Sequence, residues 1–192
     1  APIISMETNP ERKEILLALA DTSIQLLHFD EKISQVFKGH QAAIKGAIFL
    51  HEEHLLSYGA DNIAIIWKRN GAKITNLKGH QDEVNFATFN AKKTLIATCS
   101  KDQTVRLWDS QGNCLDTLPH PDFIDFATFS SDGYRLLTTC RDNQPRLWKN
   151  GKESVFAGHD STYQYSVLHA VFSPDEQTIL SASGEGNSIL WD

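Results

Sequence analysis

A histidine, a hydroxyl residue, an acid and a tryptophan recur in that order four times along the chain. The four sets are His40, Ser57, Asp61 and Trp67; His80, Thr98, Asp102 and Trp108; His120, Thr138, Asp142 and Trp148; and His159, Ser181, Glu185 and Trp191. Ser or Thr, His and an acid are the residue types of a nucleophilic catalytic triad. A nucleophile would not recur at equivalent positions, however, with apolar strand residues on both sides each time. We therefore predict that these residues are structural and that the chain has no catalytic site.

Metal binding is the second chemistry to consider, because the chain contains 8 histidines and 3 cysteines. Two residues separate His51 from His54, but no Cys or third His lies near them in the sequence. Structural zinc needs four ligands, so we predict no metal and no other cofactor. Cys99, Cys114 and Cys140 form no CxxC pair, and we expect free, buried thiols in a reducing compartment. We assign Cys99 and Cys140 to one slot, directly after the strand hydroxyl, as small apolar packing residues.

The recurring residues keep a period of about forty. The four tryptophans are 41, 40 and 43 residues apart, and the four histidines are 40, 40 and 39 apart. Each unit contains an apolar segment ending in Phe, a polar turn, a second apolar strand, a tight turn, a strand closing on Trp and a weaker fourth strand. Short strands with turns about every 8–12 residues predict antiparallel sheets. We expect core positions between these sheets for Phe49, Phe89, Phe129 and Phe172.

This pattern resembles the WD-repeat β-propeller family, whose blades carry Gly-His and Trp-Asp markers about 40–45 residues apart. Gly-His stands at 39–40, 79–80 and 158–159, and Trp-Asp at 108–109 and 191–192. The resemblance covers essentially the whole chain. It implies an all-β fold of four-stranded antiparallel blades, about five in number and nineteen strands in total, in a single propeller segment over 1–192. The expected blades span 1–38, 39–78, 79–118, 119–157 and 158–192.

The resemblance also implies a role for the recurring sets. In each set, we expect a chain of hydrogen bonds. The Trp indole bonds to the hydroxyl group, the hydroxyl group bonds to the His ring, and the His ring bonds to the acid. We expect Thr98 and Trp108, which lie equally far from residue 103, to be direct cross-strand neighbours. The first unit begins with a strand at Ile3–Thr8 and keeps an acid, Asp21, but it places leucines in the hydroxyl and Trp slots.

Partner-binding residues are carried over from the family, in which the face with the His-side loops and tight turns is the usual partner surface. The corresponding positions here include Glu83, Asn85, Lys101, Phe123, Asp125 and Arg141. We hypothesise that they form a mixed-charge patch around one exposed aromatic; the alternative is scattered surface charge. The segment from His159 to Phe172 is four residues longer than its counterparts and carries Tyr163 and Tyr165. Because binding groups often lie on lengthened loops, both tyrosines are also predicted to contact a partner.

The two ends of such an arc are expected to be incomplete. Neither the first nor the fifth unit has a polar cap, and repeat units bury their faces against neighbours. Three arrangements would solve this: a larger ring of about seven blades, five tightly closed blades, or pairing with a second copy. We favour the larger ring.

Composition narrows the function. The net charge is −6 and no basic run exceeds two residues, so nucleic acid is not an expected partner. No apolar stretch approaches the roughly 20 residues of a membrane span, and no signal peptide is visible, so we expect a cytoplasmic protein.

The leading hypothesis is a non-catalytic protein–protein interaction scaffold or sensor module, part of a larger multidomain signalling protein of the type found in bacterial members of the family. The alternatives are a propeller that recognises a peptide or glycan and an enzyme with a central-channel site.

Overall fold

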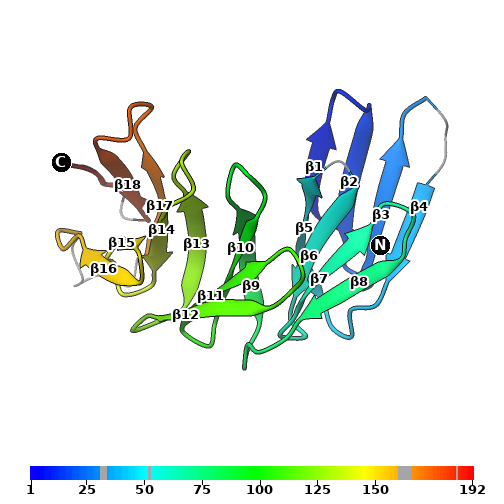
Figure 1. Cartoon of the computed structure of the whole chain (residues 1–192), viewed down its shortest axis with the longest axis horizontal. Coiled ribbons are helices and arrows are strands. Elements are labelled where there is room, and N and C mark those ends of the chain that lie inside the picture. The colour runs from blue at the N-terminus through cyan, green and yellow to red at the C-terminus, as the bar shows by residue number, and fades with distance from the viewer. Residues whose placement is uncertain (31–33, 52, 160–165, 185) are drawn as a thin grey trace.

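The computed structural model describes residues 1–30, 34–51, 53–159, 166–184 and 186–192. Within these ranges the chain forms nineteen β-strands, and no described residue belongs to a helix. The strands form five separate antiparallel sheets, arranged as an open arc (Figure 1). The predicted all-β fold of antiparallel blades is therefore confirmed. The sheets are called blade one to blade five in chain order.

Each blade is a meander in which strands that follow one another in sequence pair with one another. Blade one contains β1 (Ile3–Asn9), β2 (Glu14–Leu19), β3 (Ser23–His28) and β4 (Ser34–Lys38). Blade two contains β5 (Ile44–His51), β6 (His54–Gly59), β7 (Ala64–Lys68) and β8 (Lys73–Leu77). Blade three contains β9 (Val84–Phe89), β10 (Leu95–Ser100), β11 (Thr104–Asp109) and β12 (Cys114–Pro119). Blade four contains β13 (Ile124–Phe129), β14 (Arg135–Cys140), β15 (Arg146–Lys149) and β16 (Lys152–Val155). Blade five contains β17 (Val167–Phe172), β18 (Ile179–Ser183) and β19 (Ser188–Trp191).

The tight turn between the second and third strands has one backbone conformation in the first four blades. The residue after the turn acid has a positive φ, of 69° at Thr22, 65° at Asn62, 67° at Gln103 and 68° at Asn143. Asn adopts this left-handed conformation more readily than most residues because its short polar side chain can bond locally. The shared turn supports the alignment of Asp21 with the acids of the later blades.

The first strand of each blade lies inside the arc and the fourth lies at its outer edge. Contacts between neighbouring blades run mainly through β1, β5, β9, β13 and β17, and Figure 1 shows β12 and β16 on the outside of the arc. This arrangement leaves the turns at the two ends of the strands as the surfaces that the sequence can vary most freely.

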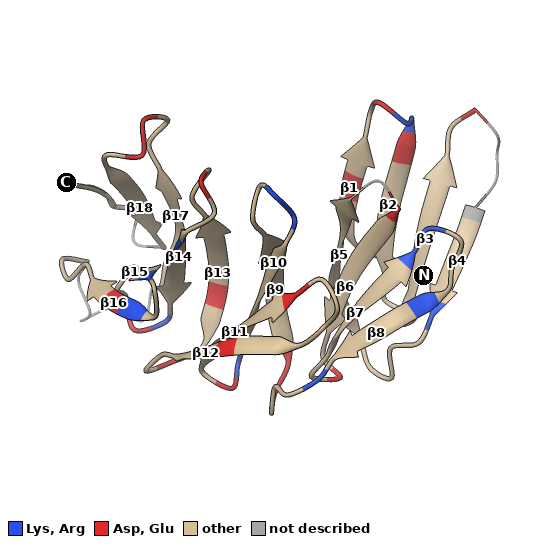
Figure 2. Ribbon diagram, viewed as in Figure 1, with Lys and Arg blue, Asp and Glu red and all other residues tan. Residues whose placement is uncertain are grey.

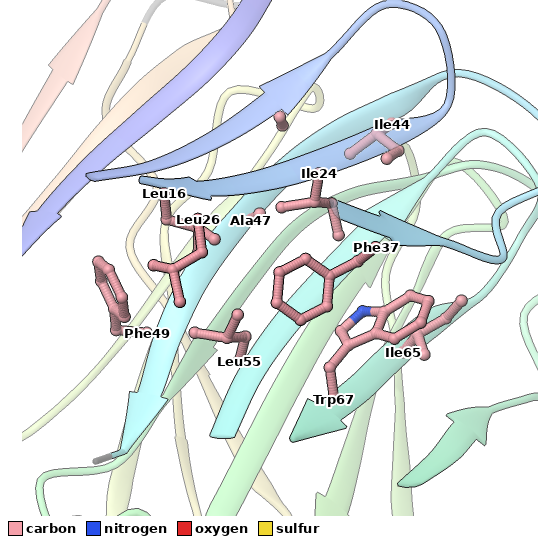
Figure 3. Close-up of a cluster of buried hydrophobic side chains, with 11 residues drawn as sticks. Leu16, Ile24, Leu26, Phe37, Ile44, Ala47, Phe49, Leu55, Ile65 and Trp67 are labelled. Carbon is pink, nitrogen blue, oxygen red and sulfur yellow. The ribbon is translucent and has the colours of Figure 1, made fainter. Parts of the chain in front are cut away.

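The hydrophobic core lies between the blades rather than in one central mass. Figure 3 shows the cluster between blades one and two, in which Phe37 meets Trp67 edge-on with ring centroids 5.8 Å apart. Three similar clusters follow along the arc. The four strand-ending phenylalanines all pack into these clusters, as expected. Each blade is therefore stabilised by burying its apolar face against the next one.

The cysteine predictions are corrected in two respects. Cys99 and Cys140 are free and buried, but Cys114 is exposed because it lies on the outer strand β12. Cys140 also does not share the slot of Cys99. Its Sγ bonds the Asp122 carbonyl at 3.2 Å, as the Ser100 hydroxyl bonds the Asp82 carbonyl at 3.0 Å. Cys140 is thus the counterpart of Ser100, two residues after the strand hydroxyl.

Blade five presents an apolar row on its outward face. The strand register places Val171, Leu180 and Leu190 side by side, with 39%, 44% and 64% of their surfaces exposed. In blade four the residue at the position of Leu180 is Leu137, which is 0% exposed because blade five covers it. At the other end of the arc, Ile3 and Met6 of β1 are also exposed. The two end faces have the composition of surfaces that the inner blades bury.

Charged residues of both signs are interspersed along the arc and lie mostly in turns (Figure 2). No helix in the described part of the chain is long and apolar enough to cross a membrane.

Candidate functional site

The recurring polar set forms a continuous hydrogen-bonded chain in blade three. The Trp108 indole N–H donates to the Thr98 hydroxyl at 2.8 Å, and the Thr98 oxygen lies 2.7 Å from His80 Nε2. His80 Nδ1 lies 2.8 Å from a carboxylate oxygen of Asp102. Because the Asp102 carboxylate can only accept, the His80 proton lies on Nδ1, and Nε2 then accepts from the Thr98 hydroxyl. These hydrogen bonds connect the loop that carries His80 and the tight turn that carries Asp102 to the buried third strand.

Blade two contains the same chain. The Ser57 hydroxyl lies 2.8 Å from both the Trp67 indole nitrogen and His40 Nε2, and His40 Nδ1 lies 2.9 Å from Asp61. Burial alone would raise the pKa of Asp61, but hydrogen bonds from His40 and the Gln41 amide outweigh burial and lower it. Asp102 follows the same rule, and its pKa falls further below its ordinary value because Thr104 also donates to it.

The hydroxyl groups in these chains are inaccessible to a substrate. Ser57, Thr98, Thr138 and Ser181 are each 0% exposed. A nucleophile must be reached by the atom it attacks, so the triad-like composition gives these residues no route to catalysis.

The register differs from the expectation that Thr98 and Trp108 face one another directly. Thr98 pairs with Arg106 and Trp108 pairs with Ile96, so the hairpin is centred one residue earlier than predicted. The indole therefore reaches the hydroxyl along a diagonal of the sheet. Such diagonal neighbours lie about 7–8 Å apart at Cα, within reach of a large aromatic side chain.

Blade four departs from the predicted set, because His120 does not bond Asp142. His120 Nδ1 instead lies 3.1 Å from the Leu118 carbonyl, while the Asp142 carboxylate is held by the Arg146 guanidinium. One residue separates Leu118 from its His, whereas two separate Leu77 from His80. The shorter loop turns the ring towards the strand backbone. Burial lowers the pKa of His120 to about 4.

In blade five the Trp191 indole donates to the Ser181 hydroxyl at 2.8 Å, and His159 Nε2 lies 2.7 Å from the same oxygen. Glu185, the predicted acid, lies outside the described residues. In blade one, where leucines replace the hydroxyl and the Trp of the polar set, a different link joins the blades: Glu14 of β2 is 2% exposed and is ion-paired with Arg69 of blade two. Sequence reasoning missed this pair, since nothing in the local pattern marks it.

His51 and His54 contact each other at the hairpin of blade two, with Nε2 and Nδ1 2.5 Å apart. Burial, followed by the charge of His51, lowers the pKa of His54. Within the described residues, no group of three or more His, Cys, Asp or Glu side chains is placed to hold a metal ion.

The predicted partner positions gather at one end of blades two to four. In each blade, the residue just before the first strand and the residue just after the second strand are joined by a backbone hydrogen bond. The amide of Lys101 donates to the Glu83 carbonyl at 3.0 Å, and the amide of Arg141 donates to the Phe123 carbonyl at 3.0 Å. These equivalent bonds hold the two positions together at the same end of each blade.

Ion pairs and one hydrogen bond between blades three and four connect the side chains into a line. Glu83 Oε2 lies 3.0 Å from Lys45 Nζ and 2.8 Å from Lys101 Nζ, and these two ammonium groups lower the pKa of Glu83. Further along, Asp125 accepts from Arg141 Nε at 2.7 Å and from Asn85 Nδ2 at 3.4 Å. We call these residues the rim surface: Lys45, Glu83, Asn85, Lys101, Phe123, Asp125 and Arg141.

Phe123 is partly buried rather than exposed, which changes the expected centre of the patch. The Arg141 guanidinium lies over its ring, 5.5 Å from the centroid. The surface therefore presents a cation stacked on an aromatic ring instead of a bare aromatic. Tyr163 and Tyr165, the other two predicted partner residues, lie outside the described residues.

Three segments, 71–109, 112–149 and 151–192, match the model of the "WD domain, G-beta repeat" family. Denticleless protein homolog A of Xenopus laevis is 38% identical over 88 residues, which cover 43% of this chain and 12% of that protein. The guanine nucleotide-binding protein subunit beta of Schizosaccharomyces pombe is 30% identical over 82 residues, covering 42% and 27%. An uncharacterized WD repeat-containing protein of Synechocystis is 25% identical over 122 residues, covering 60% and 34%. The chain thus spans at most about a third of the length of these relatives.

Proposed function

Because the chain belongs to the WD40 repeat family, we propose that it is a non-catalytic module that binds another protein through the rim surface. Proteins of this family are generally interaction scaffolds, and the hydroxyl groups that resemble a catalytic set here are fully buried. The observation that carries the proposal is the line of ion pairs across blades two to four, which the Asn85–Asp125 hydrogen bond joins between blades three and four.

The geometry of the rim surface supports a polar, oriented contact. Its three cations and two acids are held in fixed positions, and each of the four residues Glu83, Lys101, Asp125 and Arg141 keeps 25–47% of its side chain exposed. Arginine stacked on an aromatic ring is a frequent centre of binding energy in protein interfaces. Charge pairs that are already in place cost less side-chain entropy when a partner binds.

The test compares proteins captured from the native cell by the wild-type chain and by the double variant Lys101→Glu/Arg141→Glu. We expect a partner captured by the wild type to bind the variant at least about tenfold more weakly, because charge reversal at an interface is repulsive. Lys73→Glu, an exposed lysine of β8 away from this surface, is the matched control and is expected to retain the partner. If the double variant binds the partner as tightly as the wild type does and its thermal midpoint is unchanged, the rim surface is not the binding site.

We also propose that further blades complete the arc, as part of a larger cytoplasmic signalling protein. The apolar row of Val171, Leu180 and Leu190 supports the first part, because monomeric proteins rarely expose contiguous apolar surface of this kind. The three free cysteines favour a reducing compartment. Light scattering of the chain tests the idea: we expect concentration-dependent self-association that Leu180→Ser/Leu190→Ser reduces. A monodisperse wild-type monomer would contradict it, whereas a defined dimer would favour pairing with a second copy.

A further inference from the structure

A groove opens on the outer side of the arc between blades three and four. Its volume is about 320 Å³, and its apolar walls include Leu107, Leu115 and Leu118 from blade three and Phe129, Leu136 and Trp148 from blade four. This volume lies at the lower end of the range for small-ligand sites and accommodates one large side chain. We call it the lateral groove.

The groove is open because the β15–β16 hairpin of blade four is one residue shorter than its counterparts. Trp67 pairs with Lys73 and Trp108 with Cys114, each six positions on, whereas Trp148 pairs with Glu153, five positions on. Only Asn150 and Gly151 separate the strands here, and both have positive φ, as a two-residue hairpin requires.

The glycines of these hairpins show how the extra residue closes the other two junctions. A Cβ placed on Gly71 would lie 2.5 Å from Gln35 Nε2 of blade one, and one on Gly112 would lie 2.8 Å from Thr75 Cγ2 of blade two. Those hairpins press against the outer strand of the preceding blade. For Gly151 the nearest atom is Asp116 Oδ2, at 3.8 Å. The shorter hairpin stands back from β12, and the space remains open.

The charges around the lateral groove define what it can accept. Arg135 is already occupied: its Nη1 donates to the Glu176 carbonyl at 3.2 Å, its Nη2 pairs with the Glu176 carboxylate at 2.5 Å, and its guanidinium lies over Phe172. The Asp116 carboxylate, in contrast, is exposed at the mouth, and within the described part of the chain it accepts a hydrogen bond from the Thr117 amide alone. An incoming group therefore meets an apolar interior, one carboxylate and, beside Tyr134, the ammonium of Lys92, which lies 5.6 Å from the centroid of that ring.

The groove also lies beside main-chain groups suited to a peptide. Within the described residues β12 pairs only with β11, so its outer edge can pair with an added strand. Leu115 and Tyr134, which both line the groove, are 55% and 68% exposed and so are accessible to an incoming side chain.

We propose that the lateral groove binds a short extended segment of a protein partner in which a large apolar residue is followed two positions later by Lys or Arg, because alternate side chains of an extended segment lie on the same face. The apolar side chain enters between Leu115 and Trp148, and the cation pairs with Asp116. The groove is a second contact surface, separate from the rim surface. It rests on the proposed function only in assuming a protein partner.

The probes are fluorescein-labelled hexapeptides of sequence Ser-Leu-Thr-Arg-Thr-Ser and its analogues with Phe or Trp in place of Leu, measured by fluorescence anisotropy. Matched peptides carry Glu in place of Arg, or Ser in place of the apolar residue. We expect at least one Arg peptide to bind, with affinity falling about tenfold when either group is replaced. If no Arg peptide binds better than its Glu partner, the proposal is wrong.

The variants Leu115→Ser and Asp116→Lys change exposed residues and are expected to weaken binding of the Arg peptide by about tenfold each. Ile74→Ser is the matched control: Ile74 holds the position of Leu115 in blade two and is 39% exposed, but its junction is closed by the Gly112 hairpin. Insertion of Gln between Asn150 and Gly151 restores the longer hairpin and is expected to abolish binding. Wild-type affinity in the insertion variant and in Leu115→Ser would overturn the proposal.

Two further measurements distinguish a peptide site in the lateral groove from the rim surface and from an interface with a second copy of the chain. Lys101→Glu/Arg141→Glu is expected to leave peptide affinity unchanged, so failure of the rim surface and failure of the groove give different results. If Asp116→Lys abolishes self-association of the chain and no peptide binds, the groove is an interface with a second copy, and the peptide proposal is rejected.

Discussion

Thr98→Val tests whether the buried polar chain stabilises the blade as the structure implies. Valine has nearly the shape of threonine, so the variant removes a hydroxyl without opening a cavity. Two buried groups then lose their partner, the Trp108 indole N–H and His80 Nε2. A buried polar group left unpaired costs about 1–3 kcal/mol, so for two such groups we expect a loss of about 2–6 kcal/mol in the free energy of unfolding. That is a large part of the roughly 5–15 kcal/mol typical of a domain.

The assay is urea denaturation followed by far-UV circular dichroism, with the slope m compared between variants. Thr139→Val in blade four is the matched control. Thr139 is also a 0% exposed threonine, but its hydroxyl makes no hydrogen bond within the described part of the chain. Its replacement is expected to be neutral or stabilising, because burying an unpaired hydroxyl is unfavourable. Equal losses in the two variants, or a loss below about 0.5 kcal/mol in Thr98→Val, would refute the reasoning.

Three other measurements follow from the same structure. Arg69→Ala leaves the Glu14 carboxylate buried without its cation, and urea denaturation is expected to show a loss of about 3–5 kcal/mol; Arg69→Ala/Glu14→Leu should recover much of it. The pKa of Asp102 is lowered from its ordinary 3.8, so the unfolded chain takes up the proton first as the pH falls. The stability difference between wild type and Asp102→Asn is therefore expected to be full at pH 7 and to shrink below about pH 4, as urea titrations at several pH values would show. Iodoacetamide should modify Cys114 rapidly in the folded protein, whereas Cys140, whose pKa is raised by burial to about 12, and Cys99 should react only on unfolding.

The blades could be predicted from the sequence because their signal is local and repeated. The Trp and His spacing and the apolar strands gave the right strand number and sheet type, and they did so for blades one and two, which lie largely outside the matched family segments. The register of Thr98 and Trp108 was wrong by one residue. A hairpin centre depends on the turn conformation, and the positive φ of Gln103 is a property of the backbone that the residue type does not announce.

The hydrogen bonds of the polar sets were predicted correctly where the loop before the His has its usual length, and the prediction failed where that loop is shorter. In blade four, one missing residue before His120 and the presence of Arg146 redirect both the ring and the Asp142 carboxylate. Contacts between blades, such as Glu14 with Arg69, could not be found at all because the two residues lie on different repeats. The lateral groove had a signal in the sequence, namely the shorter spacing from Trp148 to its strand partner, but its meaning required the neighbouring blade.

The placement of the core between the blades has a consequence for how the protein opens. Each blade shares its apolar residues with its neighbours, so the ends of the arc have only one source of support and should fray first. The cluster between blades two and three has ten buried members, against three between blades four and five in the described part of the chain. Amide protons of blade five should therefore exchange with solvent fastest and those of blades two and three slowest, so that the arc unzips from its carboxyl-terminal end.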